Sequence, residues 1–409
     1  MGEPVLRRDH RRLGTRGLIM LSALGPGVLG LMADNDAGGM TSYLLTGARH
    51  QLLLFVPALV AMGAITLFVQ DMALRLALGG QRPFSRLVQE RFGRGWSELA
   101  AGLLHGLNVL VLATELSGMG LALSLTGLPF PWAVTLALAV VAALVGLARY
   151  RTLERTLLIV AILNGAFVIS LFTLHSGPRL TDPWTWAPSS RGTMFYLLAL
   201  AGNAMAPWMV YWQQDAVVAR GMKAWELRRG RFDLAVGVLS QIGMAFAVMW
   251  LGSSVAHTPA GYFNPLVWLQ RGGGRGTALF FALGLFDAGL LAATTITTTS
   301  SWMVRAAFRP RPAPGPRSRW RHRAAAVLPW LSLGLAALLV LGSPWSQGFL
   351  AVLTQALAAL LMPITLALLG VLSNDPATAG RFHNRRWQRW GWPAVLVLFL
   401  GLSASAWVH

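Results

Sequence analysis

Long apolar stretches separated by short polar segments dominate the chain. Each stretch is close to the roughly 20 residues that a helix needs to cross the hydrocarbon core of a bilayer. The pattern therefore predicts an all-α membrane protein with eleven transmembrane helices. The stretches cover residues 18–48, 52–78, 96–127, 130–148, 153–175, 192–219, 232–256, 277–304, 324–342, 347–372 and 391–408.

The composition supports this interpretation. Of the 409 residues, 55% are hydrophobic and only 12% are charged, whereas a soluble domain carries about 25% charged residues. A water-soluble enzyme and a disordered or fibrous chain are therefore excluded. The absence of cysteine excludes disulfides, thiolate metal sites and thiol nucleophiles. We find no catalytic triad, phosphate-binding glycine loop or ATP motif, and so expect neither an enzyme, nor a primary pump, nor a cofactor.

The net charge of +19 is distributed unevenly between the loops. With eleven spans, 29 of the 34 basic residues fall on one side and 5 on the other, and the more basic side of a membrane protein is cytoplasmic. The sequence predicts a multi-pass protein of the cell membrane with a cytoplasmic N-terminus and an extracytoplasmic C-terminus. The basic tail 1–17 lacks a signal-peptide cleavage site. Topology explains the charge without a nucleic-acid partner, and we expect a monomer in the lipid bilayer.

Two aspartates, Asp34 and Asp36, lie in the middle of the first stretch, within the segment from Ala33 to Gly39. An acidic side chain at this depth costs several kcal/mol unless it is paired, hydrated or bound to a cation. The neighbouring Asn, Asp and Gly-Gly residues favour an unwound break in the helix. Irregular backbone inside a membrane is tolerated where it lines a cavity or is buried in protein. We therefore predict a break that carries a cation site.

The sixth stretch has a matching signal in the segment from Gly202 to Trp208, which contains Pro207. Proline in a helix interior removes a backbone hydrogen bond. The two predicted breaks lie in the first helix of each of two five-helix halves, 18–175 and 192–372, with 391–408 as an additional helix. Interrupted helices at matching places in two halves indicate the binding site of an inverted-repeat transporter.

Several motifs resemble the NRAMP family, in the same order along most of the chain. Gly25-Pro26-Gly27 followed by Asp36-Ala37-Gly38-Gly39 is similar to the family's first helix, whose motif reads Asp-Pro-Gly-Asn. The segment 202–209 resembles the family's Ala-x-x-Met-Pro-His-Asn. The resemblance implies the LeuT-type five-plus-five inverted repeat with broken helices 1 and 6. It also implies transport of a divalent metal by alternating access.

The chain departs from the family pattern at most of the positions that this resemblance makes functional. The metal-binding aspartate is present as Asp36, but its asparagine partner falls on Gly39 and the sulfur-bearing methionine on Ala206. Family members use the methionine as a soft ligand and use histidine and acidic residues to carry a coupled proton. The two histidines fall on Trp208 and Gln213, and the acidic pair falls on Glu115 and Gly118.

These departures resemble the NRAMP-related magnesium transporter branch, which imports Mg²⁺ and Mn²⁺ without proton coupling. Thioethers favour softer metals, whereas oxygen ligands suit Mg²⁺, which retains several waters. We predict Asp36 as the principal ligand, assisted by backbone carbonyls near Ala33 and Asn203. Further predicted site residues are Asp34 and Gln355, which would hold the water shell, Gly39 and Ala206, and the pathway residues Glu115, Trp208 and Gln213.

Three other functions remain open at this point: a proton-coupled Mn²⁺/Fe²⁺ symporter, a Na⁺-coupled symporter for an organic solute, and a metal sensor that does not transport. For Glu115 the alternative to a pathway role is pairing with an arginine or a backbone group. The sequence leaves open the preference between Mg²⁺ and Mn²⁺ and the exclusion of Ca²⁺.

Overall fold

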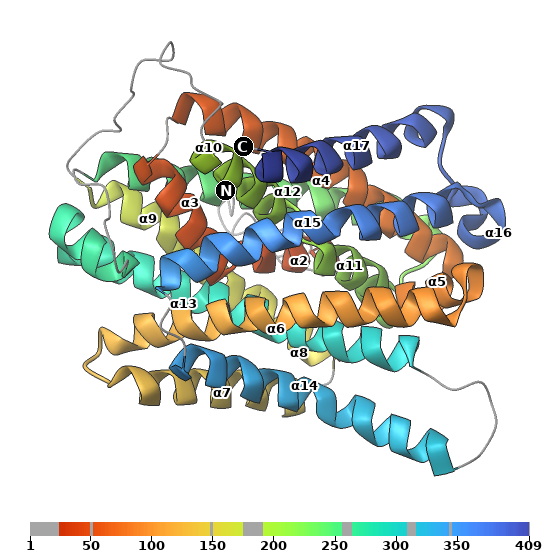
Figure 1. The fold of residues 1–409 in the computed structure, drawn as a ribbon, viewed down its shortest axis with the longest axis horizontal. Coiled ribbons are helices and arrows are strands. Elements are labelled where there is room, and N and C mark those ends of the chain that lie inside the picture. The colour runs from red at the N-terminus through yellow and green to blue at the C-terminus, as the bar shows by residue number, and fades with distance from the viewer. Residues whose placement is uncertain are drawn as a thin grey trace, which may run out of the picture.

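The computed structural model describes residues 24–49, 52–147, 150–174, 191–255, 264–308, 316–342 and 346–408. These parts are almost entirely helical, which confirms the predicted all-α class (Figure 1). The predicted N-terminal tail 1–17 lies outside the described residues.

The first half begins with a broken helix, formed by α2 and α3, and continues through further helices. Their bounds are α2 (Pro26–Asp34), α3 (Ala37–Arg49), α4 (Leu52–Gly80), the short α5 (Phe84–Phe92), α6 (Arg94–Ser124), α7 (Phe130–Leu147), α8 (Tyr150–Val160), the 3₁₀ segment η1 (Ala161–Gly165) and α9 (Ala166–Phe172).

The second half also begins with a broken helix. Its elements are α10 (Arg191–Ala204), α11 (Pro207–Arg220), η3 (Ala224–Glu226), α12 (Leu227–Ser254), α13 (Pro265–Ala307), α14 (Pro316–Gly342) and α15 (Gln347–Asn374). The chain then continues through α16 (Pro376–Ala379), η4 (Gly380–Phe382) and α17 (Arg386–Val408).

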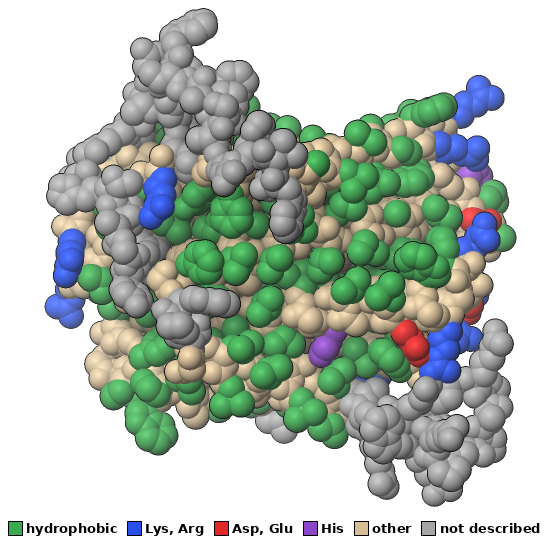
Figure 2. Space-filling model, in the orientation of Figure 1, with side chains coloured by type: hydrophobic (Ala, Val, Ile, Leu, Met, Phe, Trp, Pro, Cys, Tyr) green, Lys and Arg blue, Asp and Glu red, His purple; other side chains and the backbone are tan. Residues whose placement is uncertain are grey.

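Seven helices of the described parts are long and apolar enough to cross a membrane, and two shorter apolar helices cover Phe130–Gly146 and Val327–Gly342. Figure 2 shows hydrophobic side chains across the middle of one face, with Lys and Arg side chains near its two ends. Apolar side chains exposed around the middle of a bundle are expected of a protein surrounded by lipid. Each predicted stretch contains at least one described helix, and the number of eleven spans stays a prediction.

Three details of the helices differ from the sequence-based expectation. Helix α13 begins at Pro265, twelve residues before the predicted start at 277, and its backbone is non-helical only at Gly274 (φ 88°). The charged, glycine-rich segment that precedes residue 277 resembles a loop by composition. Helix α5 is too short to be detected as a span, and a 3₁₀ turn in η1 interrupts the fifth predicted helix.

The two broken helices lie inside the bundle, where α3 and α10 both contact α15, and α2 and α3 contact α12. A glycine permits one of these approaches: a β-carbon at Gly202 would lie 1.9 Å from the carbonyl oxygen of Gln355. Helices α10 and α15 therefore pack backbone against backbone at this level, and α15 brings Gln355 to the region of the breaks.

Candidate metal site

Both predicted breaks are present, and each is two residues long. Asn35 and Asp36 separate α2 from α3. Met205 and Ala206 separate α10 from α11, with Ala206 in an extended conformation (φ −79°, ψ 146°) and Pro207 as the first residue of α11. Proline is well suited to a first helical position because no intrahelical partner is lost there. The prediction of an interrupted backbone is confirmed in both helices.

Asp36 is buried at the first break, with 2% of its surface exposed. Its Oδ1 accepts a hydrogen bond from the backbone N–H of Gly39. The Gln355 amide nitrogen donates to Oδ1 at 3.1 Å and to Oδ2 at 3.3 Å. No ion pair to Asp36 occurs within the described residues. Its carboxylate is therefore stabilised by neutral N–H groups, which leaves its charge uncompensated.

Asp34 is the last residue of α2 and connects the first break to the second. Its Oδ2 accepts a 2.5 Å hydrogen bond from Nε2 of Gln241. The same nitrogen donates to the carbonyl oxygen of Ala204 at 3.2 Å, and the Thr66 hydroxyl donates to that carbonyl at 2.8 Å. The Ala204 carbonyl at the end of α10 thus accepts hydrogen bonds from side chains of α4 and α12. Gln241 of α12 therefore holds the end of α2 and the end of α10 together.

Asn203 contacts the first turn of α3 directly. Its Nδ2 donates to the carbonyl oxygen of Gly39 at 3.0 Å. The predicted residues Asp36, Gly39, Asn203 and Gln355 are therefore brought together by direct contacts. Ala33 and Ala206, which are 0% and 4% exposed, lie buried next to the two breaks.

Glu115 on α6 lies at the start of α3. Its Oε2 accepts a 2.7 Å hydrogen bond from the N–H of Ala37, and its Oε1 is 3.4 Å from the N–H of Gly38. The first N–H groups of a helix have no intrahelical partner and favour negative charge. Of the two alternatives for this residue, the structure thus shows pairing with backbone groups, whereas its pathway role stays a prediction.

Trp208 and Gln213 lie on α11 and are 0% and 3% exposed. The Trp208 indole nitrogen has no hydrogen-bond partner among the described residues. Their predicted pathway role is not tested by these contacts.

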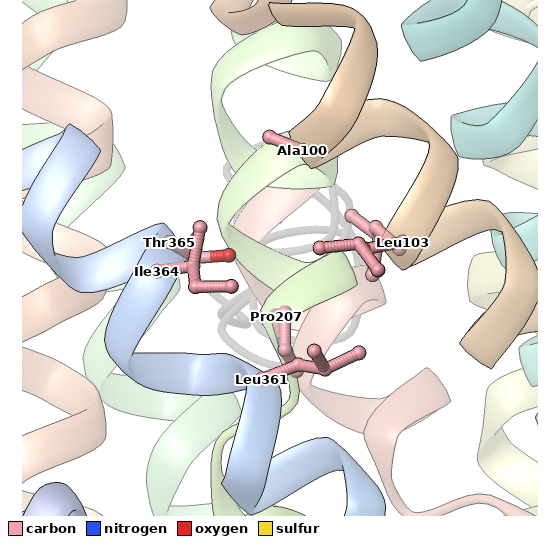
Figure 3. Close-up of a pocket in the computed structure, with 7 residues that line it drawn as sticks. Ala100, Leu103, Pro207, Leu361, Ile364 and Thr365 are labelled. Carbon is pink, nitrogen blue, oxygen red and sulfur yellow. The ribbon is translucent and has the colours of Figure 1, made fainter. Parts of the chain in front are cut away.

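A small hollow lies beside the second break. It is lined by Pro207 together with side chains of α6 and α15, and Figure 3 shows them around it. Its volume is about 10 Å³, room for about one water molecule, and Thr365 supplies the one polar side chain drawn there. The hollow is therefore apolar and too small to hold a hydrated cation.

Sequence reasoning missed Asp233 on α12, which holds the beginning of α2. Its carboxylate accepts hydrogen bonds from the N–H groups of Gly25 at 2.7 Å, Gly27 at 2.7 Å and Val28 at 3.2 Å. An aspartate near a helix end has many possible partners, and only the packing of α12 against α2 selects this one.

Comparison with known proteins identifies the family of this chain. Residues 27–408 match the family described as Nramp, natural resistance-associated macrophage protein-like. The chain belongs to the Nramp family. This confirms the resemblance seen in the motifs of the two broken helices.

Two bacterial relatives are similar over most of the Nramp chain. The divalent metal cation transporter MntH 1 of Pseudomonas aeruginosa is 26% identical over 397 residues, which cover 89% of this chain and 86% of the relative. The divalent metal cation transporter MntH of Xylella fastidiosa is 22% identical over 401 residues, covering 92% and 82%.

Solved structures show the same fold at low sequence identity. The crystal structure of a mutant form of the manganese transporter of Eremococcus coleocola has a TM-score of 0.73 at 18% identity, covering 97% of this chain and 87% of that one. The nucleobase-cation-symport-1 family transporter MHP1 has a TM-score of 0.60 at 14% identity, covering 94% and 90%. The predicted LeuT-type fold with two broken helices is confirmed.

Proposed function

We propose that this Nramp protein transports divalent metal cations across the membrane, with Asp36 as the principal ligand. One observation carries the proposal: the buried carboxylate of Asp36 lies at the first helix break and has no cationic partner among the described residues. Gly39, which donates to this carboxylate, also accepts a hydrogen bond from Asn203 near the end of α10, at the second break. A cation would compensate this charge, which is otherwise costly inside a membrane. The relatives named as divalent metal cation transporters support the same function.

We further propose that the transported ion is Mg²⁺, and also Mn²⁺, in a partly hydrated form. Position 206 carries alanine, so it offers no thioether to a soft metal, whereas Asp36 and Asn203 offer oxygen atoms. Oxygen ligands and water suit Mg²⁺ and Mn²⁺, and Mg²⁺ keeps several of its waters. Asp34, Gln355 and the backbone carbonyls near Ala33 are the groups assigned to the water shell.

Uptake in this proposal needs no proton coupling. An inward-negative potential contributes about 2.3 kcal/mol per charge per 100 mV, so a divalent cation gains about twice that amount. The positions of the family's proton-carrying residues hold Gln213, Trp208 and Gly118, and Glu115 is bonded to the N–H groups of α3. The broken helices of the halves 18–175 and 192–372 would move to expose the site to each side in turn.

The proposed setting is the cell membrane, with a cytoplasmic N-terminus, an extracytoplasmic C-terminus and a monomeric protein. The bias of basic residues towards one side supports this orientation. A proton-coupled Mn²⁺/Fe²⁺ symporter is the alternative, since the relatives' names specify divalent metals without naming the coupling.

The experiment is uptake into proteoliposomes that contain an Mg²⁺- or Mn²⁺-sensitive dye, with a pH-sensitive dye in parallel. We expect Mg²⁺ and Mn²⁺ entry driven by a potassium-diffusion potential, with no internal acidification. Asp36→Ala should abolish entry. The matched control is Asp287→Asn, which changes another buried carboxylate that is bonded to Asn164 between η1 and α13.

Each outcome separates the hypotheses. Entry of Mn²⁺ with internal acidification would identify the proton-coupled alternative, and binding without entry would identify a sensor. Unchanged entry in Asp36→Ala, with the control also unchanged, would remove the central residue of the proposal.

A further inference from the structure

The side chain of Asn203 occupies the space that a side chain at position 39 would need. A β-carbon built on Gly39 would lie 1.9 Å from Oδ1 of Asn203, far inside van der Waals contact. The motif resemblance puts an asparagine at position 39, on the first turn of α3. In this chain an asparagine amide is present at the same place, but it comes from α10.

The oxygen end of this amide is the unpaired end. Nδ2 of Asn203 donates to the carbonyl oxygen of Gly39 at 3.0 Å, which fixes the plane of the amide. Oδ1 is buried and has no hydrogen-bond partner among the described residues. A buried acceptor without a partner is costly, so its persistence needs an explanation such as a ligand.

The free oxygen lies beside the carboxylate of Asp36. The same built β-carbon is 2.8 Å from Oδ1 of Asp36 and 1.9 Å from Oδ1 of Asn203, so the two oxygens are at most 4.7 Å apart. Two oxygens bound to one Mg²⁺ at about 2.0–2.1 Å are separated by up to about 4.2 Å. A small movement of either side chain is therefore enough for both to bind one ion.

We propose that the side-chain Oδ1 of Asn203 is a metal ligand, and that it replaces the amide missing at Gly39. This inference rests on the proposed metal transport and adds a ligand to it. The ligand pair of a carboxylate and a neutral amide is then kept, but it joins the two broken helices instead of lying on one. Binding of the ion would thereby couple α10 to α3 directly, in addition to their contact through Nδ2.

The test moves the amide from one helix to the other. Asn203→Ala removes the oxygen and keeps a good helix-forming residue. The double variant Gly39→Asn/Asn203→Ala places an amide at position 39, where the clash with Asn203 is gone and the carboxylate of Asp36, 2.8 Å from the new β-carbon, must shift. We expect Asn203→Ala to weaken the apparent Mg²⁺ affinity by roughly tenfold or more. The double variant should recover most of that loss. Gly39→Asn alone should be impaired because its side chain meets Asn203.

Two measurements distinguish a ligand from a structural contact. The first is the Mg²⁺ concentration at half-maximal uptake, and the second is the rise in unfolding temperature that Mg²⁺ causes in detergent, because a ligand stabilises the state that binds it. A purely structural role of Asn203 depends on the bond to Gly39, which the double variant does not restore. Asn203→Ala would then lower the unfolding temperature without metal, and the double variant would not recover uptake.

The inference and the proposed function fail in different ways. If the unaltered protein neither takes up Mg²⁺ or Mn²⁺ nor is stabilised by them, the proposed function is wrong. If it does both and Asn203→Ala keeps the same affinity, or the folded double variant binds no better than the single one, the ligand role of Asn203 is overturned and metal transport stands.

Discussion

The carboxylate of Glu115 caps α3 from a different helix: its Oε2 lies 2.7 Å from the backbone nitrogen of Ala37, the residue that follows Asp36. Because α6 supplies this cap, the position of Asp36 depends on the packing of α6 against α3. The Thr114 hydroxyl lies 3.1 Å from Oε1 of Glu115 and 2.7 Å from the carbonyl oxygen of Val111, and its one proton is shared between these two acceptors.

Removal of this cap should destabilise the protein. Glu115→Ala leaves two N–H groups of α3 buried without an acceptor, and we expect the free energy of unfolding to fall by about 2 kcal/mol. Glu115→Gln keeps one acceptor oxygen and should lose less. Unfolding temperatures in detergent measure the difference, and equal stability of all three proteins would contradict the capping role.

Restoring the second acidic residue of the family pattern should fail for a steric reason. A β-carbon at Gly118 would lie 2.5 Å from the β-carbon of Ala37, so Gly118→Asp must displace the start of α3. We expect reduced stability and reduced uptake, without acquired proton transport. The variant Gly118→Asp/Ala37→Gly removes the clash and should regain stability. If Gly118→Asp alone were as stable as the unaltered protein, the close packing of α6 and α3 would be refuted.

A thioether at the second break should change the metal preference. Ala206 is buried, in an extended backbone conformation, and Ala206→Met would supply a soft ligand that favours Mn²⁺ over Mg²⁺. We expect the uptake ratio of Mn²⁺ to Mg²⁺ to rise by about tenfold, equivalent to about 1.4 kcal/mol. Competition between the two ions in proteoliposomes measures this ratio. Ile364→Met, on α15 at the apolar hollow beside Pro207, is the control, and a similar change in both variants would argue against a role of position 206.

The interrupted helices could be predicted because their causes are local. Asn35 and Pro207 disfavour continuous helix, and a carboxylate such as Asp36 in an apolar stretch signals an unusual environment. Proline alone is not decisive, because Pro363 lies inside the continuous helix α15. The contacts of the site are different in kind. Gln355 is separated from Asp36 by 319 positions in the sequence, and only the packing of α15 against α10 at Gly202 brings it there.

The role of the glycines also depends on tertiary structure. From the sequence, Gly39 and Gly118 are positions where the family pattern has a polar side chain. In the structure the space is filled, by Asn203 at the first position and by Ala37 at the second. A sequence shows that a side chain is missing at a position. Helix packing determines which neighbouring side chain fills the space.

Asp233 holds the start of α2 by hydrogen bonds, so loss of its carboxylate should loosen that end of the broken helix. Its carboxylate accepts three N–H groups, from Gly25, Gly27 and Val28, and Arg220 donates to the carbonyl of Leu24 at 3.2 Å beside them. For α2 to move away from α12 during transport, these bonds must break. Asp233→Ala should therefore increase the fraction of molecules in which the beginning of α2 is open.

The opening of the start of α2 can be measured by thiol alkylation, because the sequence contains no cysteine that would also react. Val28→Cys places a single thiol at a position that is 2% exposed, and its alkylation should be several-fold faster when combined with Asp233→Ala. The control Asp71→Asn changes a carboxylate that bonds Arg75 and Arg231 instead. Equal alkylation rates with and without Asp233 would show that other contacts hold α2 closed, because the thiol reacts only when this segment separates from α12.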